Sequence, residues 1–185
     1  MGPLNGGALI FNQMMIPERM TSGGGAIGGA QAALDLAAQY TMKRKAFGRP
    51  IRKFQAVNHM LADSITKLDA ARGLIYLAAR TVDDGRPHRR MVSEAKKFCT
   101  EAAWEVVNNA MQMMGGIGYT DIYPVERIFR DLRLSSIWTG TNEVMSMIIA
   151  NEWYREHLAA RSDAAVRDAE DDAHGAGDLE EKVFE

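Results

Sequence analysis

The chain has 185 residues, with 46% hydrophobic and 25% charged side chains and a formal net charge of −2. These values are ordinary for a globular protein, and they exclude a largely disordered or collagen-like chain. No apolar run reaches the roughly 18 residues of a membrane helix, and the first residues lack the pattern of a signal peptide, so we expect neither.

Cysteine content and charge distribution indicate the expected compartment and the possible ligands of the chain. Cys99 is the single cysteine, so an internal disulfide is excluded and a reducing compartment is expected, either cytoplasmic or the mitochondrial matrix. Residues 159–185 hold nine acidic and three basic side chains, whereas residues 1–158 hold 15 acidic and 19 basic ones. We expect a solvated acidic extension after the main domain. The mildly basic body either favours a phosphorylated ligand or is a solvated surface, and no nucleic acid is expected as a partner.

The first predicted helix centres on residues 31–40, which are rich in the strong helix formers Ala and Leu. Apolar residues recur around this segment at three- and four-residue spacing, which indicates one buried face. The pattern predicts a helix that reaches back towards Pro17 and ends near Gly48 and Pro50. Glycine supplies a left-handed stop, and proline disfavours helix at the residue before it.

The rest of the body also has helical periodicity. The remaining predicted helices cover residues 54–83, residues 91–114, a short segment from Tyr123 and Pro124, and a last segment from Thr141 or Asn142 to His157. The apolar stripes of the two long helices include Ile65 and Phe98. No stretch alternates with period two, so no sheet is expected. The sequence therefore predicts an all-α antiparallel bundle of long helices over residues 1–158.

Two patterns that resemble ligand sites have simpler explanations. Gly23, Gly25 and Gly28 fit G-x-G-x-x-G, but the dinucleotide motif needs a preceding strand, so we interpret these glycines as helix-packing positions. A di-iron centre in a bundle needs Glu three residues before His. The four histidines are His59, His88, His157 and His174, and none has a Glu three residues before it. No metal site is therefore expected.

Three segments carry a more specific signal. Residues 44–55 contain Arg-Lys-Ala-Phe-Gly-Arg-Pro-Ile and then Phe-Gln, and residues 112–119 are Gln-Met-Met-Gly-Gly-Ile-Gly-Tyr. Residues 123–143 run from Tyr-Pro-Val-Glu-Arg through Arg-Asp to Thr-Gly-Thr-Asn-Glu. In this order and spacing, the segments resemble the C-terminal helical domain of the acyl-CoA dehydrogenases over about residues 4–158. The fold that this resemblance implies is also an antiparallel bundle of long helices.

The resemblance implies an FAD-dependent α,β-dehydrogenation of an acyl-CoA thioester. A carboxylate removes the α-proton, the β-hydrogen leaves as hydride to the flavin, and an electron-transferring flavoprotein reoxidises the flavin. Members of the family form homodimers or homotetramers. They also carry an N-terminal helical domain and a middle β-domain, which these 185 residues do not supply. We therefore expect a fragment, a truncated product or one half of a split enzyme.

By resemblance, seven residues would contact FAD. Arg44 matches an arginine that contacts the pyrophosphate across a subunit interface, and its planar fork suits phosphate oxygens. Without its neighbours, Arg44 would be interpreted as a solvated surface residue. Phe47 matches an aromatic residue near the adenine. The remaining matches lie at the adenosine, ribose or flavin: Gln55, Gln112, Gly116, Thr141 and Glu143.

The catalytic base is where the sequence departs from many members. Short- and medium-chain types have Glu at the position of Thr139, and threonine cannot take an α-proton unaided. Isovaleryl and long-chain types carry the base in a Glu-Arg pair, which here is Glu18 and Arg19. Glu18 is therefore the candidate base, unless the pair is only an exposed helix ion pair. Arg19 would position substrate or restrain the opposite loop. Trp138 and Thr139 would line the acyl pocket, although a tryptophan there is also compatible with a core role.

Two other functions fit the same sequence. A non-catalytic helical dimerisation module would keep the bundle without binding flavin productively. An acyl-CoA oxidase would share the resemblance and pass its electrons to oxygen. The acyl chain length is not encoded in any motif of this chain.

Overall fold

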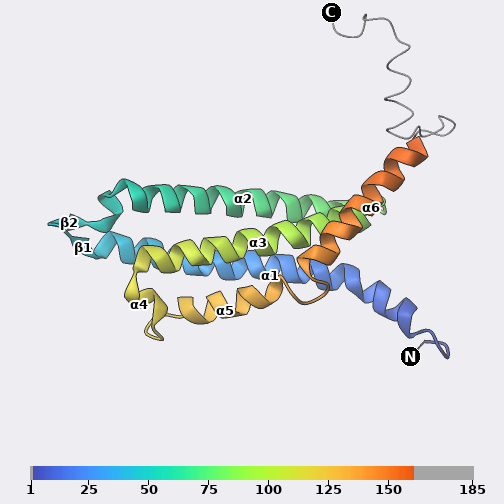
Figure 1. Cartoon of the computed structure of the whole chain (residues 1–185), viewed down its shortest axis with the longest axis horizontal. Coiled ribbons are helices and arrows are strands. Elements are labelled where there is room, and N and C mark those ends of the chain that lie inside the picture. Colours follow the sequence, from blue (N-terminus) through green and yellow to red (C-terminus); the bar gives the residue numbers. More distant parts are fainter. Residues whose placement is uncertain (1, 161–185) are drawn as a thin grey trace, which may run out of the picture. The chain divides into compact units, whose positions relative to one another are not determined.

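The computed structural model describes residues 2–160 (Figure 1). Its elements are α1 (Gly7–Lys43), β1 (Lys45–Ala46), β2 (Arg49–Pro50), a 3-10 turn (Ile51–Lys53), α2 (Gln55–Asp83), α3 (Arg89–Met114), α4 (Gly116–Tyr119), α5 (Val125–Ser135) and α6 (Asn142–Ala160). The predicted all-α class is confirmed. From residue 161 on, the predicted acidic extension lies outside the described residues. Within those residues, no helix is both long and apolar enough to cross a membrane.

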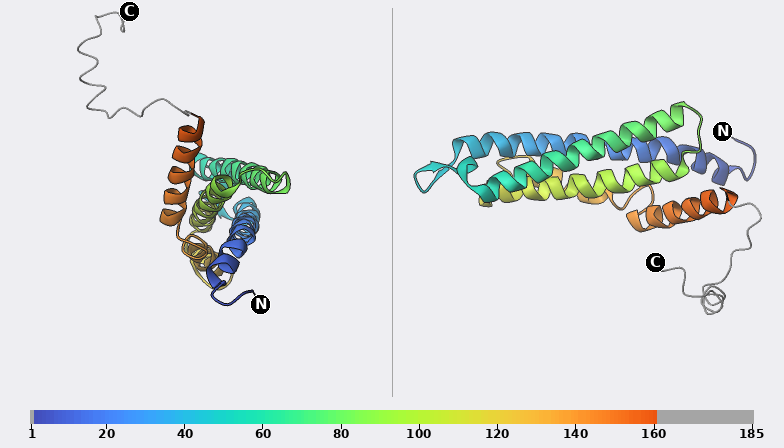
Figure 2. Two further views of the ribbon diagram at one scale, coloured as in Figure 1. Left: turned by 90° about the vertical axis from the view of Figure 1, so that its right-hand side faces the viewer. Right: turned by 90° about the horizontal axis from the view of Figure 1, so that it is seen from above.

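The chain divides into two compact units, and the bundle is the unit that ends at Glu152. Helices α1, α2 and α3 lie side by side, with α3 packed against both of the others, and α5 packs against α1 and α3 (Figures 1 and 2). The core is built mainly from short side chains, which let helices approach closely. Its wholly buried members include Ala30, Ala33, Ala37, Ala71, Ala78, Ala103, Val106 and Val107.

Helix α1 differs from its prediction at both ends. It runs through Pro17 and begins at Gly7, because residues 8–16 are mostly good helix formers that offset the roughly 3 kcal/mol cost of an internal proline. It ends at Lys43, well before Gly48. Arg44 leaves the helix with extended backbone angles, while its N–H still donates to the carbonyl of Tyr40.

Gly48 serves a hairpin and not the end of a helix. Lys45 pairs with Pro50 and Ala46 pairs with Arg49 in an antiparallel ladder. The two turn residues, Phe47 and Gly48, have φ angles of 50° and 77°, which is the pattern of a type I′ turn. The expectation of no sheet is therefore wrong for this one short pair, and the turn chemistry explains why.

The glycines of the G-x-G-x-x-G pattern do not share one role. A Cβ on Gly23 would lie 2.7 Å from Cδ1 of Ile75 and 3.5 Å from Cβ of Cys99, so the close-packing interpretation is confirmed there. Cβ atoms on Gly25 and Gly28 would meet nothing within 4 Å. For these two glycines the packing interpretation is wrong, and Gly25 instead lines a cavity.

Two predicted stripe residues lie outside the core. Ile65 of α2 is 47% exposed, and Phe98 of α3 is also exposed. Leu68, from the same predicted stripe, and Cys99, predicted as a core thiol, are buried as expected. Helix α2 packs mainly against α1 and α3, so its outer side, which includes Ile65, is left uncovered in this unit.

Candidate functional site

A cavity of about 410 Å³ lies between α1, α5 and the loop that follows α5. We call it the Glu18 cavity. One face of α1 forms its first wall, because the lining residues recur at helical spacing: Glu18, Thr21, Ser22, Gly25 and Ala26. The second wall consists of Asp131, Leu132, Ser135, Trp138 and Thr139. The predicted residues Glu18, Trp138 and Thr139 therefore meet in one place.

The loop of residues 136–141 enters this cavity with unusual backbone angles. Thr139 has a φ of 53° and Gly140 a φ of 94°. A Cβ on Gly140 would lie 2.8 Å from Cε of Met145, so only glycine fits without displacement of a neighbour. The Thr139 hydroxyl is buried and has no hydrogen-bond partner within the described structure. A left-handed threonine costs on the order of 1–3 kcal/mol and persists only where the surroundings hold it.

Two contacts from α1 hold this loop. Nε of Arg19 donates a hydrogen bond to the carbonyl of Thr139 at 3.3 Å, and Nε1 of Trp138 donates to Oγ of Ser22 at 2.7 Å. Arg19 is only 8% exposed. Burial, followed by repulsion from Arg89, lowers the pKa of the Arg19 guanidinium. Arg19 does not line the Glu18 cavity, so its contact fits a loop-restraining role better than direct substrate positioning.

Asp131 is a lining residue that the sequence analysis did not single out. It brings a second carboxylate into the Glu18 cavity, from α5. The available signal was its spacing from Ser135, since residues four apart share one helix face. Any assignment of a base in this cavity therefore has to distinguish Glu18 from Asp131.

A second cavity, of about 430 Å³, lies where the end of α1 meets the end of α3 and α4. It brings together three predicted cofactor residues, Arg44, Gln112 and Gly116. We call it the Arg44 cavity. A guanidinium fork, a side-chain amide and glycine backbone form a donor set that suits phosphate and ribose oxygens.

Phe47 and Gln55 do not line the Arg44 cavity. Phe47 is 94% exposed at the tip of the hairpin. Its ring meets that of Phe54 edge to face, with centroids 6.1 Å apart, and the Arg49 guanidinium lies 4.2 Å from the Phe54 ring centroid. Gln55 begins α2 and is exposed. Both face outward on this chain, where a second molecule can reach them.

The last two predicted cofactor residues, Thr141 and Glu143, line a third cavity of about 300 Å³. We call it the Glu143 cavity. Hydrogen bonds from the Glu143 backbone amide and from the Thr141 hydroxyl lower the pKa of the exposed Glu143 carboxyl. Glu143 also lies in the first turn of α6, where a negative charge is favourable. The Glu143 and Glu18 cavities lie at the C-terminal end of α5, and the Arg44 cavity lies near α4, which precedes α5.

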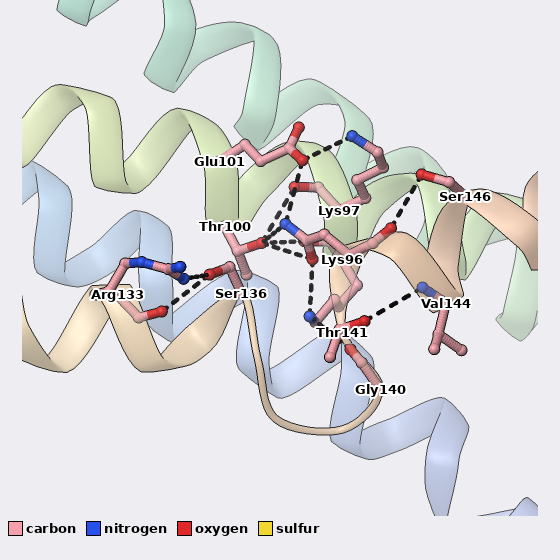
Figure 3. A network of polar contacts seen from close by, with 11 residues as sticks. Lys96, Lys97, Thr100, Glu101, Arg133, Ser136, Gly140, Thr141, Val144 and Ser146 are labelled. Atoms are coloured by element: carbon pink, nitrogen blue, oxygen red, sulfur yellow. Dashed lines mark hydrogen bonds and ion pairs between the residues drawn. The ribbon is translucent and has the colours of Figure 1, made fainter.

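Lys96, which Figure 3 labels beside Gly140, was missed by the sequence analysis, as was its partner Asn142. Lys96 is wholly buried. Its Nζ donates to the Gly140 carbonyl at 2.9 Å and to Oδ1 of Asn142 at 2.8 Å. The available signal was a lysine four residues after Val92 and three before Cys99, which is a position on the buried face of α3.

Comparison with known proteins agrees with this geometry. A family model described as "Acyl-CoA dehydrogenase, C-terminal domain" matches residues 5–153. The fold is thus that of a helical dehydrogenase domain. The chain belongs to the acyl-CoA dehydrogenase family.

The chain is 38% identical over 156 residues to the cyclohexane-1-carbonyl-CoA dehydrogenase of Geobacter metallireducens, covering 84% of this chain and 41% of that protein. Butyryl-CoA dehydrogenase from Megasphaera elsdenii superposes with a TM-score of 0.80 at 36% identity, covering 83% of this chain and 40% of that one. A chain in the structure of the electron transferring flavoprotein of Acidaminococcus fermentans gives 0.80 and 38%, with the same coverage. The chain therefore spans about 40% of the length of these relatives.

Proposed function

We propose that this chain is the part of an FAD-dependent acyl-CoA dehydrogenase that supplies the catalytic base, and that Glu18 is that base. The observation that carries the proposal is the shared cavity. Glu18 on α1 and Thr139 on the opposite loop line the same space, and these match the two positions from which the family presents its base. With threonine at one position, Glu18 occupies the other.

The lining of the Glu18 cavity suits the reaction. The Glu18 carboxylate would accept the α-proton of the thioester. Leu132 and Trp138 add apolar surface that excludes water from the acyl chain, and Gly25 leaves room beside them. Arg19, through the Thr139 carbonyl, would keep the loop at its distance from α1.

The Arg44 cavity offers the donors that the cofactor requires. Arg44 and Gln112 would hold pyrophosphate and adenosine oxygens, and Gly116 admits close approach of the backbone. Thr141 and Glu143 would contact the cofactor from the Glu143 cavity, and the outward-facing Phe47 and Gln55 would contact the cofactor of a neighbouring subunit. When bound, FAD supplies the acceptor for the β-hydride.

The proposed partners follow from the same assignment. They are an acyl-CoA substrate, an electron-transferring flavoprotein as acceptor, and a second copy of the chain in a homodimer or homotetramer. Similarity to a chain in an electron transferring flavoprotein structure supports the acceptor. The buried free thiol of Cys99 suits a reducing compartment, the cytosol or the mitochondrial matrix.

The test uses the chain joined to the N-terminal and middle domains that its relatives carry. Glu18→Gln keeps the shape of the side chain and removes its basicity. Flavin reduction by acyl-CoA should fall by at least about 10²-fold, the low end for removal of a general base. Substrate binding should change far less, because the lost interaction belongs to the transition state.

Asp131→Asn is the matched control, since it removes the other carboxylate of the same cavity. It should leave the rate of flavin reduction within a few fold of the parental rate. The double change Glu18→Gln with Thr139→Glu should recover part of the lost rate. If Glu18→Gln reduced the flavin at the parental rate and Asp131→Asn lost most of that rate, the base would be Asp131 instead.

Flavin binding has an independent test. The joined protein should be yellow with one FAD per chain, and Arg44→Met should weaken FAD retention while leaving helix content unchanged. A colourless parental protein would contradict the proposal and favour a non-catalytic helical module.

A further inference from the structure

Alternate residues of the loop after α5 face different surroundings. Thr139 lines the Glu18 cavity and Thr141 lines the Glu143 cavity. The residues next to them, Gly140 and Asn142, give their oxygens to Lys96. The buried Lys96 ammonium therefore holds the loop segment that lines both the Glu18 cavity and the Glu143 cavity.

The Lys96 contacts are part of a closed network. Nδ2 of Asn142 donates to Oγ1 of Thr100 at 3.1 Å and to Oε1 of Glu101 at 3.3 Å, and its backbone N–H donates to the Ser136 carbonyl at 3.1 Å. Asn142 is thus fixed on every polar side by α3 and by the loop itself. A satisfied buried network of this kind rigidifies the residues it connects.

The loop needs such restraint. Thr139 and Gly140 both have left-handed backbone angles, which relax unless neighbouring groups hold them. Arg19 holds the Thr139 carbonyl from α1, and Lys96 holds the next carbonyl from α3. Two cations on two helices thus hold successive carbonyls.

We propose that Lys96 is a positioning residue that clamps the loop of residues 136–141 and thereby sets the place of Trp138 and Thr139 in the Glu18 cavity. The proposal rests on the proposed function only in treating that cavity as a substrate site. Lys96 itself lines neither cavity, so it acts through Gly140 and Asn142.

The clamp should respond to pH. The charged groups that face Lys96 are Arg19 on α1, Glu101 on its own helix and Glu143 on α6. Burial and then Arg19 lower the pKa of Lys96 to about 8, while Glu101 and Glu143 oppose the shift. Loss of the charge leaves neutral, weaker hydrogen bonds to the loop.

The indole proton of Trp138 reports on the clamp, because it donates to Ser22 only while the loop is in place. The full 185-residue chain has three tryptophans, so its ¹⁵N-edited spectrum shows three indole signals, and Trp138→Phe assigns one of them. Lys96→Met should accelerate solvent exchange of this proton at least tenfold at pH 7. Lys67→Met is the matched control, since Lys67 pairs with Glu105 and neither residue touches the loop or the Lys96 network.

The parental Trp138 signal should also shift between pH 7 and 9 with a midpoint near 8. Lys67→Met should keep this transition and Lys96→Met should lose it. Parental exchange in a folded Lys96→Met variant overturns the proposal. If that variant does not fold, the pH titration of the parent decides, and a Trp138 signal that stays constant from pH 7 to 9 overturns it. No readout involves substrate, so the base assignment stands or falls separately.

Discussion

The Lys96 ammonium is removed from water, and neutral oxygens replace its hydration. Burial is the main cause that lowers its pKa from the ordinary value of 10.5 to about 8. The charged form is therefore less favourable in the native chain than in the unfolded chain. The lysine orders a loop and also carries a cost in global stability, as buried charges commonly do.

This cost predicts a pH dependence. Between about pH 8 and 10.5 the unfolded chain keeps the Lys96 proton while the native chain has lost it. The unfolded state then binds more protons, so stability rises with pH through this window. Relative to Lys96→Met, the parent should gain on the order of 3 kcal/mol in unfolding free energy from pH 8 to 10.5. Urea titrations of both proteins measure the difference, and a constant difference would contradict the assignment.

The resemblance to the acyl-CoA dehydrogenases singled out residues that the structure brings together. Glu18, Trp138 and Thr139 were each singled out from local motifs, and the structure brings them to one cavity. Asp131 and Lys96 were missed because their surroundings come from other helices. Helical spacing puts Lys96 on the buried face of α3 and Asp131 on the face of Ser135, but spacing alone does not show which groups of other helices meet them there.

At the scale of elements, two adjacent glycines of α1 have different surroundings. Gly23 faces the other helices, where a side chain would collide with Ile75. Gly24, the next residue, is exposed, with no atom within 4 Å of an added Cβ. Each glycine costs about 1 kcal/mol relative to alanine in a helix interior. Only at Gly23 does close helix packing offset this loss of helix propensity.

The pair gives a matched prediction. Gly24→Ala should stabilise the chain by about 1 kcal/mol, since the helix gains propensity and no contact changes. Gly23→Ala should give no gain, because displacing Ile75 from its packed position cancels or exceeds the propensity term. Thermal unfolding followed by circular dichroism distinguishes the two variants. Equal stabilisation would show that α1 and α2 separate easily at this point.

The lengths of α2 and α3 were predictable, and the ends of α1 were not. The long apolar periodicity of residues 54–83 and 91–114 outweighs local variation, so these helices begin and end within two residues of their predictions. Beyond the end of α1, the sequence around Gly48 is compatible with either a helix stop or a hairpin turn. The pairing of Lys45 with Pro50 decides between them, and pairing between strands is not a local property.

At the scale of the whole molecule, α2 leaves large apolar side chains exposed. Ile65 and Tyr76 are 47% and 68% exposed. They are eleven residues apart, which is close to three turns, so they lie on one stripe, with the ion pair of Asp69 and Arg72 between them. The sequence placed Ile65 in the core from its periodicity, and that inference holds only if something outside this chain covers the stripe.

We predict that a second copy of the chain covers it. Arg44 matches a residue that reaches a neighbouring subunit's cofactor, and the exposed α2 stripe supplies apolar area of the kind that obligate interfaces bury, usually about 2,000 Å² or more. Sedimentation velocity at micromolar concentration should give a dimer or a larger closed oligomer. Ile65→Lys should shift the chain towards monomer, because a charge would enter the buried stripe.

Thr66→Lys provides the control for this last experiment. Thr66 is the next residue on α2, is exposed, and uses its hydroxyl within its own helix on the Ala62 carbonyl. The same charge there should leave the mass unchanged, so a loss of association in Ile65→Lys alone identifies the stripe and not net charge as the cause. If Ile65→Lys kept the oligomer mass of the parent, the interface would lie on another surface. A monomeric parent at tens of micromolar would refute self-association through these helices.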